Sequence, residues 1–433
     1  MESDRRSERA KKRLTRLAVG LTGLCVVGLL VSWWHLANGS PEVVIPDPVM
    51  PVPNAFDYYV AAGKAVINEK QIDDINTLKP VIAMTLAQKE AVIVQNAAAL
   101  ESLHQGFAYE YRNPPLRSAY ATIPYLSPMR GVARLLKAQS RVRAQQGDWG
   151  GAADSALDAI RLGEDILRGG PRLMEMTGVA CQAIGQKPLW ETIDHLDASQ
   201  SRAVIARLTG LLESRFPYAD TLQEEKWYGQ AILKELFQTI TPRNALAAAD
   251  QWTERDAPPS RRYWTAFALL SNRRGILQEY NSYLDASVTQ ARRPYAARLP
   301  LPTPNDITGI IAGYFAESAR CTDVSVETKN DLLLITLALH LYQLEHGHAP
   351  SALTELTPAY LQRLPDDPFA LQGTFKYRLQ GNTYTLYSIG PDGKDDGGTP
   401  IDDLKYAGAS NSRRRYLVLE DSRGDLVAGI NFP

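Results

Sequence analysis

This sequence has few cysteines, almost no net charge and no familiar catalytic motif. Its 433 residues include only three cysteines, and 47 basic side chains nearly balance 48 acidic ones, giving a net charge of −1. Because nucleic-acid-binding proteins carry an excess of basic charge, this balance argues against nucleic acid as a partner. There is no Gly-x-Ser-x-Gly, no phosphate-binding glycine loop and no cysteine within a catalytic signature. We therefore predict that the protein is not an enzyme, with no catalytic residue and no small-molecule substrate.

The scarcity of cysteine also limits what disulfides can contribute. Cys25 lies in an apolar run near the N-terminus, which leaves Cys181 and Cys321 in the rest of the chain. An oxidising compartment permits a disulfide between these two. Two buried free thiols are an equally good interpretation, because a pair 140 residues apart has no diagnostic spacing. The sequence leaves both interpretations open.

Charge and hydropathy are distributed unevenly at the N-terminus. Residues 1–16 carry seven Arg and Lys against three acids, and residues 17–37 contain no Asp, Glu, Lys or Arg. A helix of this second length spans roughly 31 Å, the thickness of a bilayer core. Basic residues before a span favour the cytoplasmic side. We predict a cytoplasmic tail at 1–16, a single-pass membrane anchor at 17–37 and an extracytoplasmic, periplasmic location for residues 38–433.

A cleaved signal peptide is the alternative to an anchor. Ala37, Asn38 and Gly39 form a small-x-small pattern that suits a signal peptidase. The apolar run, however, is longer than the roughly 7–15 residues of a signal-peptide core, and this favours the anchor. With either interpretation, the remainder of the chain lies outside the cytoplasm.

The remainder divides into a linker and two regions of different pattern. Residues 38–53 form a linker with five prolines, and proline favours an extended chain. Residues 54–298 have helical spacing and few helix breakers, which predicts an all-α domain. In residues 305–433 a long helix precedes segments that alternate apolar and polar residues, as half-buried strands do. We predict a mainly α protein with a small C-terminal α+β module that contains an antiparallel hairpin.

Short signals predict particular turns and strands. Gly147-Asp148 joins two alanine-rich helical segments, which resemble one tetratricopeptide unit without a second copy, so we predict an isolated helical hairpin. Gly381-Asn382 suits a two-residue hairpin turn between strands. Residues 416–420 and 425–432 are short apolar runs that we expect to form two further strands.

The C-terminal region resembles a known family. The helix DLLLITLALHLYQLEHGHAP precedes LTELTPAYLQRLPDDPF and then FKYRLQGNTYTLYSIGPDGKDDGG, all within residues 331–403. A helix, a leucine-rich turn, an Asp-Pro-Phe element, a tyrosine-containing hairpin and a Tyr-Ser-x-Gly-x-Asp-Gly loop follow in this order. That order is similar to the globular part of the major (G-type) pseudopilin of type II secretion systems. The resemblance implies a pseudopilin-like module.

The resemblance also implies a calcium-binding loop within YSIGPDGKDDGGTPIDD (387–403), which we call the Asp/Gly loop. Carried onto this sequence, the family's ligand set becomes the carbonyl of Ile389, Asp392, and Asp402, Asp403 or Asp425. The chemistry is reasonable, because Ca²⁺ binds six to eight oxygens and glycines let a loop turn its carbonyls inward. A solvated acidic turn without a metal is the alternative.

Two features separate the chain from true pseudopilins. The anchor has neither a Gly-Phe leader-cleavage signature nor the glutamate that the family's first helix carries. In addition, a long helical region separates the predicted anchor from the module. We therefore expect neither leader processing nor pilus assembly, and interpret the C-terminal region as a related module in another architecture.

A histidine cluster offers a different metal site. His340, His346 and His348 lie within nine residues, beside Glu345, and all are zinc-ligand types. Their spacing is not His-Glu-x-x-His, and His340 and His346 would lie on nearly opposite sides of a helix. His346-Gly347 fits better as a helix C-terminus, where a cationic side chain and a glycine are both favourable.

These patterns together predict a membrane-anchored, extracytoplasmic scaffold or assembly protein of a bacterial cell envelope. It would bind a protein partner, carry a Ca²⁺-stabilised C-terminal module and be linked to secretion. One alternative is an extracytoplasmic metal-dependent hydrolase that uses His340, His346 and His348. Another is a plain helical protein-binding module.

Overall fold

The computed structural model describes most of the chain after residue 40. The described residues are 41–77, 83–241, 243–251, 259–302, 304, 307–313, 321–381, 383–402 and 418–431. The predicted tail and anchor therefore lie outside the described part. Among the helices within it, none combines the length and the apolar character that crossing a membrane requires.

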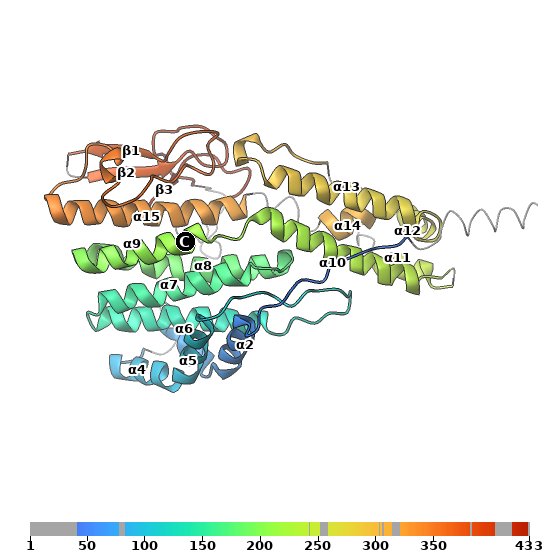
Figure 1. The fold of residues 1–433 in the computed structure, drawn as a ribbon, viewed down its shortest axis with the longest axis horizontal. Coiled ribbons are helices and arrows are strands. Elements are labelled where there is room, and N and C mark those ends of the chain that lie inside the picture. The colour runs from blue at the N-terminus through green and yellow to red at the C-terminus, as the bar shows by residue number, and fades with distance from the viewer. Residues whose placement is uncertain are drawn as a thin grey trace, which may run out of the picture. The chain divides into compact units, whose positions relative to one another are not determined.

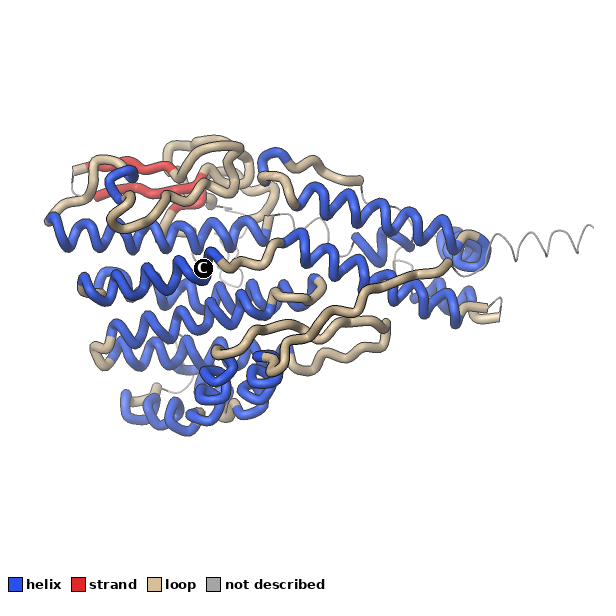
Figure 2. The backbone as a smooth tube through the Cα atoms, viewed as in Figure 1, coloured by secondary structure: helices blue, strands red, loops and turns tan. Residues whose placement is uncertain are grey.

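The described part is mainly helical with one small sheet, as predicted (Figures 1 and 2). Its α-helices are α2 (Ala55–Ala65), α3 (Glu69–Asn76), α4 (Leu86–Gln95), α5 (Ala97–Gly106), α6 (Leu126–Gln145), α7 (Trp149–Ile166), α8 (Arg172–Thr192), α9 (Ala198–Glu213), α10 (Tyr218–Thr239), α11 (Ala245–Gln251), α12 (Pro259–Ser271), α13 (Arg273–Ala291), α14 (Ile307–Gly313) and α15 (Thr322–His346). Short 3-10 helices are η1 (Ile193–His195), η2 (Tyr295–Ala297) and η3 (Leu353–Leu356). The strands are β1 (Lys376–Gln380), β2 (Thr383–Ser388) and β3 (Leu426–Val427). They form one antiparallel sheet in the order β1-β2-β3.

The described residues belong to two compact units. The first unit draws on Met1–Ile45, Gly229–Tyr283 and Thr303–Tyr314, and the second on Pro46–Tyr228, Leu284–Pro302 and Phe315–Pro433. In the first unit α11 packs against α12, and Gln230 Nε2 donates a hydrogen bond to Asn281 Oδ1 at 2.7 Å. The second unit contains the sheet and all the sites described below.

The predicted helical hairpin is present in the second unit. Gly147 joins α6 to α7 with a φ of 81°, and Asp148 caps α7 by accepting a hydrogen bond from the Gly151 amide at 2.9 Å. α7 and α8 then pack very closely. A Cβ added to Gly163 or to Gly178 would lie 2.5 Å from the carbonyl oxygen of the other glycine. Small side chains therefore set the spacing between these two helices.

One hydrophobic core connects the helices of the second unit to its sheet. Buried side chains of α7, α8, α9 and α15 belong to the same cluster as Phe369, Leu386 and Leu426 beside and within the sheet. Figure 1 shows α15 between α9 and the strands, and residues 328–339 of α15 are buried on all sides, as a helix between two layers must be. The compact units therefore divide along a different line from the predicted boundary between 54–298 and 305–433, because α15 packs on both layers.

The sheet matches the predicted hairpin and shortens the predicted strands that follow. Gln380 pairs with Thr383 across a two-residue turn, in which Gly381 has a φ of 60°. Within the described residues 425–431 of the run predicted at 425–432, the strand formed is β3. The chain turns there, since the amides of residues 430 and 431 donate back to the Val427 carbonyl. Of the strand predicted at 416–420, residues 418–420 are not in a strand and the others lie outside the described residues.

Candidate functional site

Asp425, one of the predicted calcium ligands, holds the Asp/Gly loop through hydrogen bonds to its backbone. Its side chain is buried and accepts hydrogen bonds from the backbone amides of Asp396 at 3.3 Å and Gly398 at 2.6 Å. Its own amide donates to the Thr399 carbonyl at 2.7 Å, and its carbonyl accepts from the Ile401 amide at 3.0 Å. Burial raises the pKa of Asp425, and the two amide hydrogen bonds oppose that shift. Asp425 therefore closes the loop by binding its backbone.

Asp367 holds the other end of the loop in the same way, and sequence analysis missed this role. Its Oδ1 accepts hydrogen bonds from Ser388 Oγ at 2.7 Å and the Phe369 amide at 3.0 Å, and its Oδ2 accepts from the Ile389 amide at 3.0 Å. Burial raises the pKa of Asp367, while these hydrogen bonds lower it. An Asp before Pro indicates a turn, but it does not show that the side chain reaches β2.

The remaining predicted calcium ligands have separate surroundings. Asp392 Oδ1 accepts a hydrogen bond from the Lys394 amide at 3.2 Å, Asp402 is exposed, and Asp403 lies outside the described residues. Within the described ranges, no group of three or more His, Cys, Asp or Glu side chains is placed to hold a metal ion. The predicted calcium site also draws on the Ile389 carbonyl and on Asp403, so it stays a prediction.

The three histidines lie against main-chain carbonyls and two tyrosines, Tyr342 and Tyr360. His340 Nε2 lies 2.9 Å from the Leu196 carbonyl oxygen. The ring of His346 stacks on Tyr342 with 4.1 Å between centroids, and the ring of His348 meets the same tyrosine edge-on at 5.9 Å. α15 ends at His346, as the helix-terminus interpretation predicted. These contacts give each ring a structural role and supply no observation in favour of a hydrolase.

Cys181 and Cys321 are both free and buried in the structure. The sequence left open a disulfide or two buried free thiols, and the structure has the free thiols. Burial raises the pKa of each thiol to about 12. Because the thiolate is the reactive form of cysteine, neither side chain is activated as a nucleophile.

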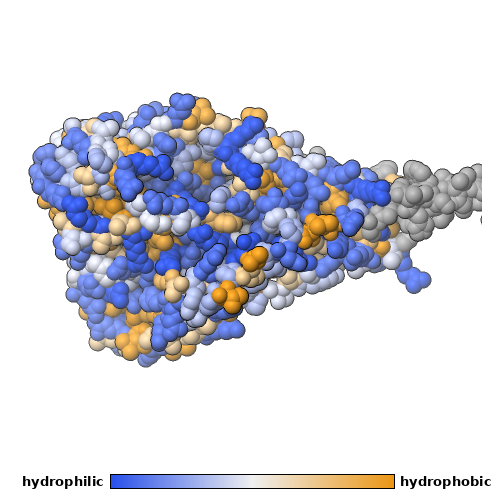
Figure 3. All heavy atoms as spheres, in the orientation of Figure 1, coloured by the Kyte–Doolittle hydropathy of each residue, from blue (hydrophilic) through white to orange (hydrophobic). Residues whose placement is uncertain are grey.

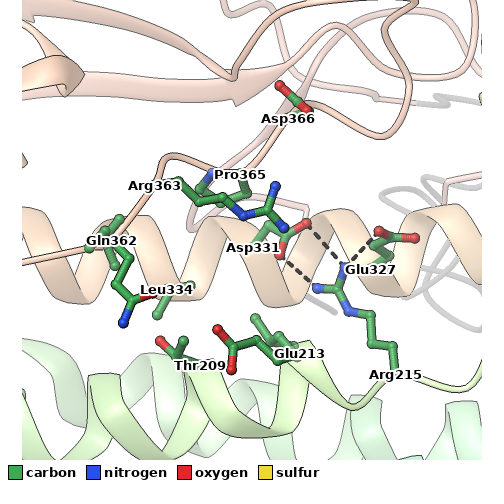
Figure 4. Close-up of a pocket in the computed structure, with 12 residues that line it drawn as sticks. Thr209, Glu213, Arg215, Glu327, Asp331, Leu334, Gln362, Arg363, Pro365 and Asp366 are labelled. Carbon is green, nitrogen blue, oxygen red and sulfur yellow. Dashed lines mark hydrogen bonds and ion pairs between the residues drawn. The ribbon is translucent and has the colours of Figure 1, made fainter. Parts of the chain in front are cut away.

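A polar cleft of about 280 Å³ lies between α9, α15 and the segment that leads into the sheet (Figure 4). Its polar lining residues are Thr209, Glu213, Arg215, Glu327, Asp331, Gln362, Arg363 and Asp366. We call it the Arg363 cleft. It combines carboxylates, guanidinium groups, an amide and a hydroxyl, so it offers both hydrogen-bond donors and acceptors to whatever enters.

Arg215 makes one wall of the Arg363 cleft rigid. Its Nη1 lies 2.6 Å from Glu327 Oε1 and its Nη2 lies 2.6 Å from Asp331 Oδ1, as the dashed lines in Figure 4 mark. Burial raises the pKa of Asp331 to about 6, and the charge of Arg215 opposes the shift. An arginine between two carboxylates is held in one geometry, because its planar fork matches them.

Other side chains of the cleft carry charges that are not used within the described part of the chain. Arg363, Gln362 and Glu213 are exposed, and no hydrogen bond or ion pair to Arg363 or Glu213 is found among the described residues. Figure 4 shows the side chains of Glu213, from α9, and Arg363, from the segment that leads into the sheet, reaching into the space between them, whereas Asp366 points away. Glu213 and Arg363 are therefore available to a ligand.

No sequence motif marks the Arg363 cleft. Its ion-paired residues are 112 and 116 positions apart, and each looks like an ordinary surface charge in its own helix. The pseudopilin resemblance covers Gln362 and Arg363 but gives them no role. Comparison with known proteins adds no identity: no family model, no curated protein and no solved structure matches this chain.

Proposed function

We propose that this protein is a membrane-anchored scaffold of the cell envelope that binds a partner protein in the Arg363 cleft. The observation that carries the proposal is a set of exposed side chains, Glu213 at the end of α9 and Gln362 and Arg363 on the segment that leads into the sheet, which offer charges of both signs and an amide to the cleft. Another part of the cleft, with Arg215 between Glu327 and Asp331, is already fixed. Such an arrangement suits a polypeptide segment, whose main chain and polar side chains need donors and acceptors together.

The size and lining of the cleft favour a protein segment over a small molecule. Small-molecule sites commonly enclose about 300–1,000 Å³ and are lined mostly by apolar side chains. The Arg363 cleft has about 280 Å³, and most of its lining residues are polar. On the face of the molecule visible in Figure 3, hydrophobic residues lie in small separate groups among hydrophilic ones. Recognition through polar groups agrees with that surface.

The C-terminal module is the second part of the proposal. We infer that it is pseudopilin-like and that Ca²⁺ stabilises the Asp/Gly loop, with Asp392 as the first candidate ligand. Two buried carboxylates, Asp367 and Asp425, accept hydrogen bonds from the loop backbone. A cation would therefore bind a loop whose backbone is already held in place. A module of this kind links the scaffold to secretion.

The anchor at residues 17–37 is the third part, and labelling in intact cells tests it. A Lys70→Cys variant places a thiol at an exposed position of α3, and Ser7→Cys places one in the predicted cytoplasmic tail. A membrane-impermeant maleimide should label the first variant and leave the second unlabelled until the membrane is broken. Equal labelling of the two variants in intact cells would contradict the proposed membrane topology.

Site-specific photo-crosslinking tests the binding function. A photo-reactive amino acid at Gln362 should give one discrete crosslinked product in cells that express the full chain. The same amino acid at Lys70, an exposed position of α3 that does not line the cleft, is the matched control and should not give that product. Adding Arg363→Glu should abolish the product from Gln362, since charge reversal opposes the proposed contact.

The full chain has to be used in this experiment. Deleting residues 305–433 would remove α15, which shares a core with α8 and α9, and the helical region would lose its packing. The scaffold proposal fails if Gln362 gives no product beyond that of Lys70. It also fails if Arg363→Glu leaves the Gln362 product unchanged, since the partner would then not occupy the cleft.

A further inference from the structure

A second cavity, of about 240 Å³, lies in the second unit beside α7, α8, α15 and the first turn of α10. We call it the Glu164 cavity. It shares Arg215 and Glu327 with the Arg363 cleft, but it also has three carboxyl side chains that the cleft lacks: Glu164, Glu175 and Asp323. Nothing in the proposed scaffold function makes use of them.

Each of these three carboxyl groups has an oxygen without a hydrogen-bond partner among the described residues. The atoms are Glu164 Oε2, Glu175 Oε1 and Asp323 Oδ1. Glu164 and Glu175 are only 4% and 3% exposed, so bulk water does not satisfy them. Buried polar atoms are nearly always hydrogen-bonded, because a group that leaves water without a new partner loses free energy. Arg215 Nε, a donor of the same lining, is also without a partner among the described residues, but the three unpartnered oxygens outnumber it and still call for a donor inside the cavity.

Glu164 is the most isolated of the three. Glu175 is paired with Arg172, and Asp323 Oδ2 lies 3.4 Å from Arg298 Nη1. For Glu164, no ion pair is found within the described part of the chain. Burial raises its pKa to about 7, although nearby arginines oppose the shift. A positively charged donor next to Glu164 would restore its charged form.

The rest of the lining suits an organic cation. Phe216 lines the cavity together with apolar side chains such as Leu167 and Val179, while the ring of Tyr218, also in the lining, already has the guanidinium of Arg172 5.5 Å from its centroid. Aromatic faces attract cations, and apolar walls accommodate the carbon stem of an amine or guanidinium group. Among the described side chains no group of three metal-ligand types is arranged to hold a metal ion. These observations favour N–H donors over a metal.

We propose that the Glu164 cavity binds a small organic cation with N–H donors, with Glu164 as its ion-pair partner. The ligand is the size of a lysine or arginine side chain, and it is either a free amine or the basic side chain of a bound peptide. The two sources share one chemistry, so the probes below separate them. The proposal does not depend on the Arg363 cleft, and either can fail without the other.

Calorimetric titration of the full chain in detergent tests the proposal. The probes are 1,4-diaminobutane and L-arginine as free cations, the tripeptide Gly-Arg-Gly as a peptide, and citrulline as the neutral analogue of arginine. We expect saturable binding of at least one cationic probe and none of citrulline. Glu164→Gln should weaken that binding by about ten- to a hundredfold, the range for a hydrogen bond to a charged group. Glu191→Gln, the same change at an exposed position of α8 that lines neither the cavity nor the cleft, should leave it unaltered.

Two further measurements keep the test decisive. Val179→Phe fills the cavity without touching its carboxyl groups and should also abolish binding, even if Glu164→Gln does not fold. The cationic probe should raise the melting temperature of the native protein and not that of the cavity variants. Preference for the free cations or for the tripeptide identifies the source of the ligand. Failure of every cationic probe to bind, equal binding of citrulline, or binding unaffected by both cavity variants would overturn the proposal.

Discussion

The Asp/Gly loop and the Glu164 cavity are both acidic, yet within the described part of the chain the buried carboxyl groups of the loop are hydrogen-bonded and that of Glu164 is not. In the loop, Asp367 and Asp425 accept hydrogen bonds from amides and a hydroxyl of nearby backbone and side chains. In the cavity, Glu164 is just as buried and has no such partner among the described residues. A carboxylate that is saturated by its own chain stabilises the fold. A buried carboxylate without such partners can still accept hydrogen bonds from another molecule.

Among the variants that test this contrast, we expect the largest loss of folding stability at Asp367. Asp367→Ala removes the acceptor of three hydrogen bonds and leaves the donors of Ser388, Ile389 and Phe369 without a partner in a buried site. We expect the free energy of unfolding to fall by about 3–5 kcal/mol. Urea denaturation measures it. Asp366→Ala, the exposed neighbour, is the control and should change stability by less than about 0.5 kcal/mol. Similar losses in both variants would contradict a special role for Asp367.

The second prediction concerns the pH dependence that Glu164 confers. Burial raises its pKa from 4.5 to about 7, so the folded state holds a proton that the unfolded state has released in this interval. Its contribution to stability is therefore complete below pH 4.5 and is lost as the pH rises through about 7. The shift corresponds to about 3 kcal/mol.

Urea denaturation at about pH 5 and about pH 8 measures that contribution. The native protein should lose more stability between the two values than Glu164→Gln, which cannot titrate. Glu213→Gln should behave like the native protein, because its side chain is exposed. If Glu164→Gln keeps the full pH dependence of stability, a group other than Glu164 causes that dependence.

Calcium removal is the third test, and it bears on the loop. If Ca²⁺ binds only the folded Asp/Gly loop, a free concentration one hundred times the Kd adds about 2.7 kcal/mol to stability. Melting curves in EDTA and in millimolar Ca²⁺ should then differ, and Asp392→Ala should remove the difference. Asp396→Ala is the control, because it is a loop aspartate outside the proposed ligand set. Identical curves for the native protein would leave the loop stabilised by its own hydrogen bonds alone.

The smallest expected effect is at Asp425. Asp425→Asn keeps the shape of the side chain and one carbonyl acceptor, but it weakens the hydrogen bonds from the amides of Asp396 and Gly398. We expect a loss of about 2 kcal/mol, within the range for hydrogen bonds to a charged group. Asp421→Asn, an exposed aspartate on the same segment, should be neutral. A loss that appears only in the presence of Ca²⁺ would show instead that Asp425 is a ligand.

Local patterns in the sequence predicted the fold class and several particular elements. The φ-flexible Gly147 with its capping Asp148, the helix end at His346 and the two-residue turn after Gln380 each depend on neighbouring residues alone. The predicted strand at 425–432 was too long, because the chain turns back through hydrogen bonds to Val427 that periodicity does not reveal.

The candidate sites could not be predicted in the same way. Arg215 meets Asp331 across 116 positions, and the Glu164 cavity combines side chains from α7, α8 and the start of α15. No spacing rule relates residues on helices that are so far apart in the chain. The acids that stood out in the sequence, such as Asp395 and Asp396, are exposed, while the buried ones had no motif around them.

The sequence by itself determined that this chain is mainly helical with a small antiparallel hairpin, where individual elements such as α7 begin and α15 ends, and that its acidic loop follows β2. Those features depend on backbone preferences and on contacts between neighbouring residues. The tertiary structure decided which carboxyl groups are buried and which of them find a partner. It did so through the close packing of α7 on α8 and the burial of α15 between helices and sheet, because desolvation and pairing depend on what surrounds a side chain in space.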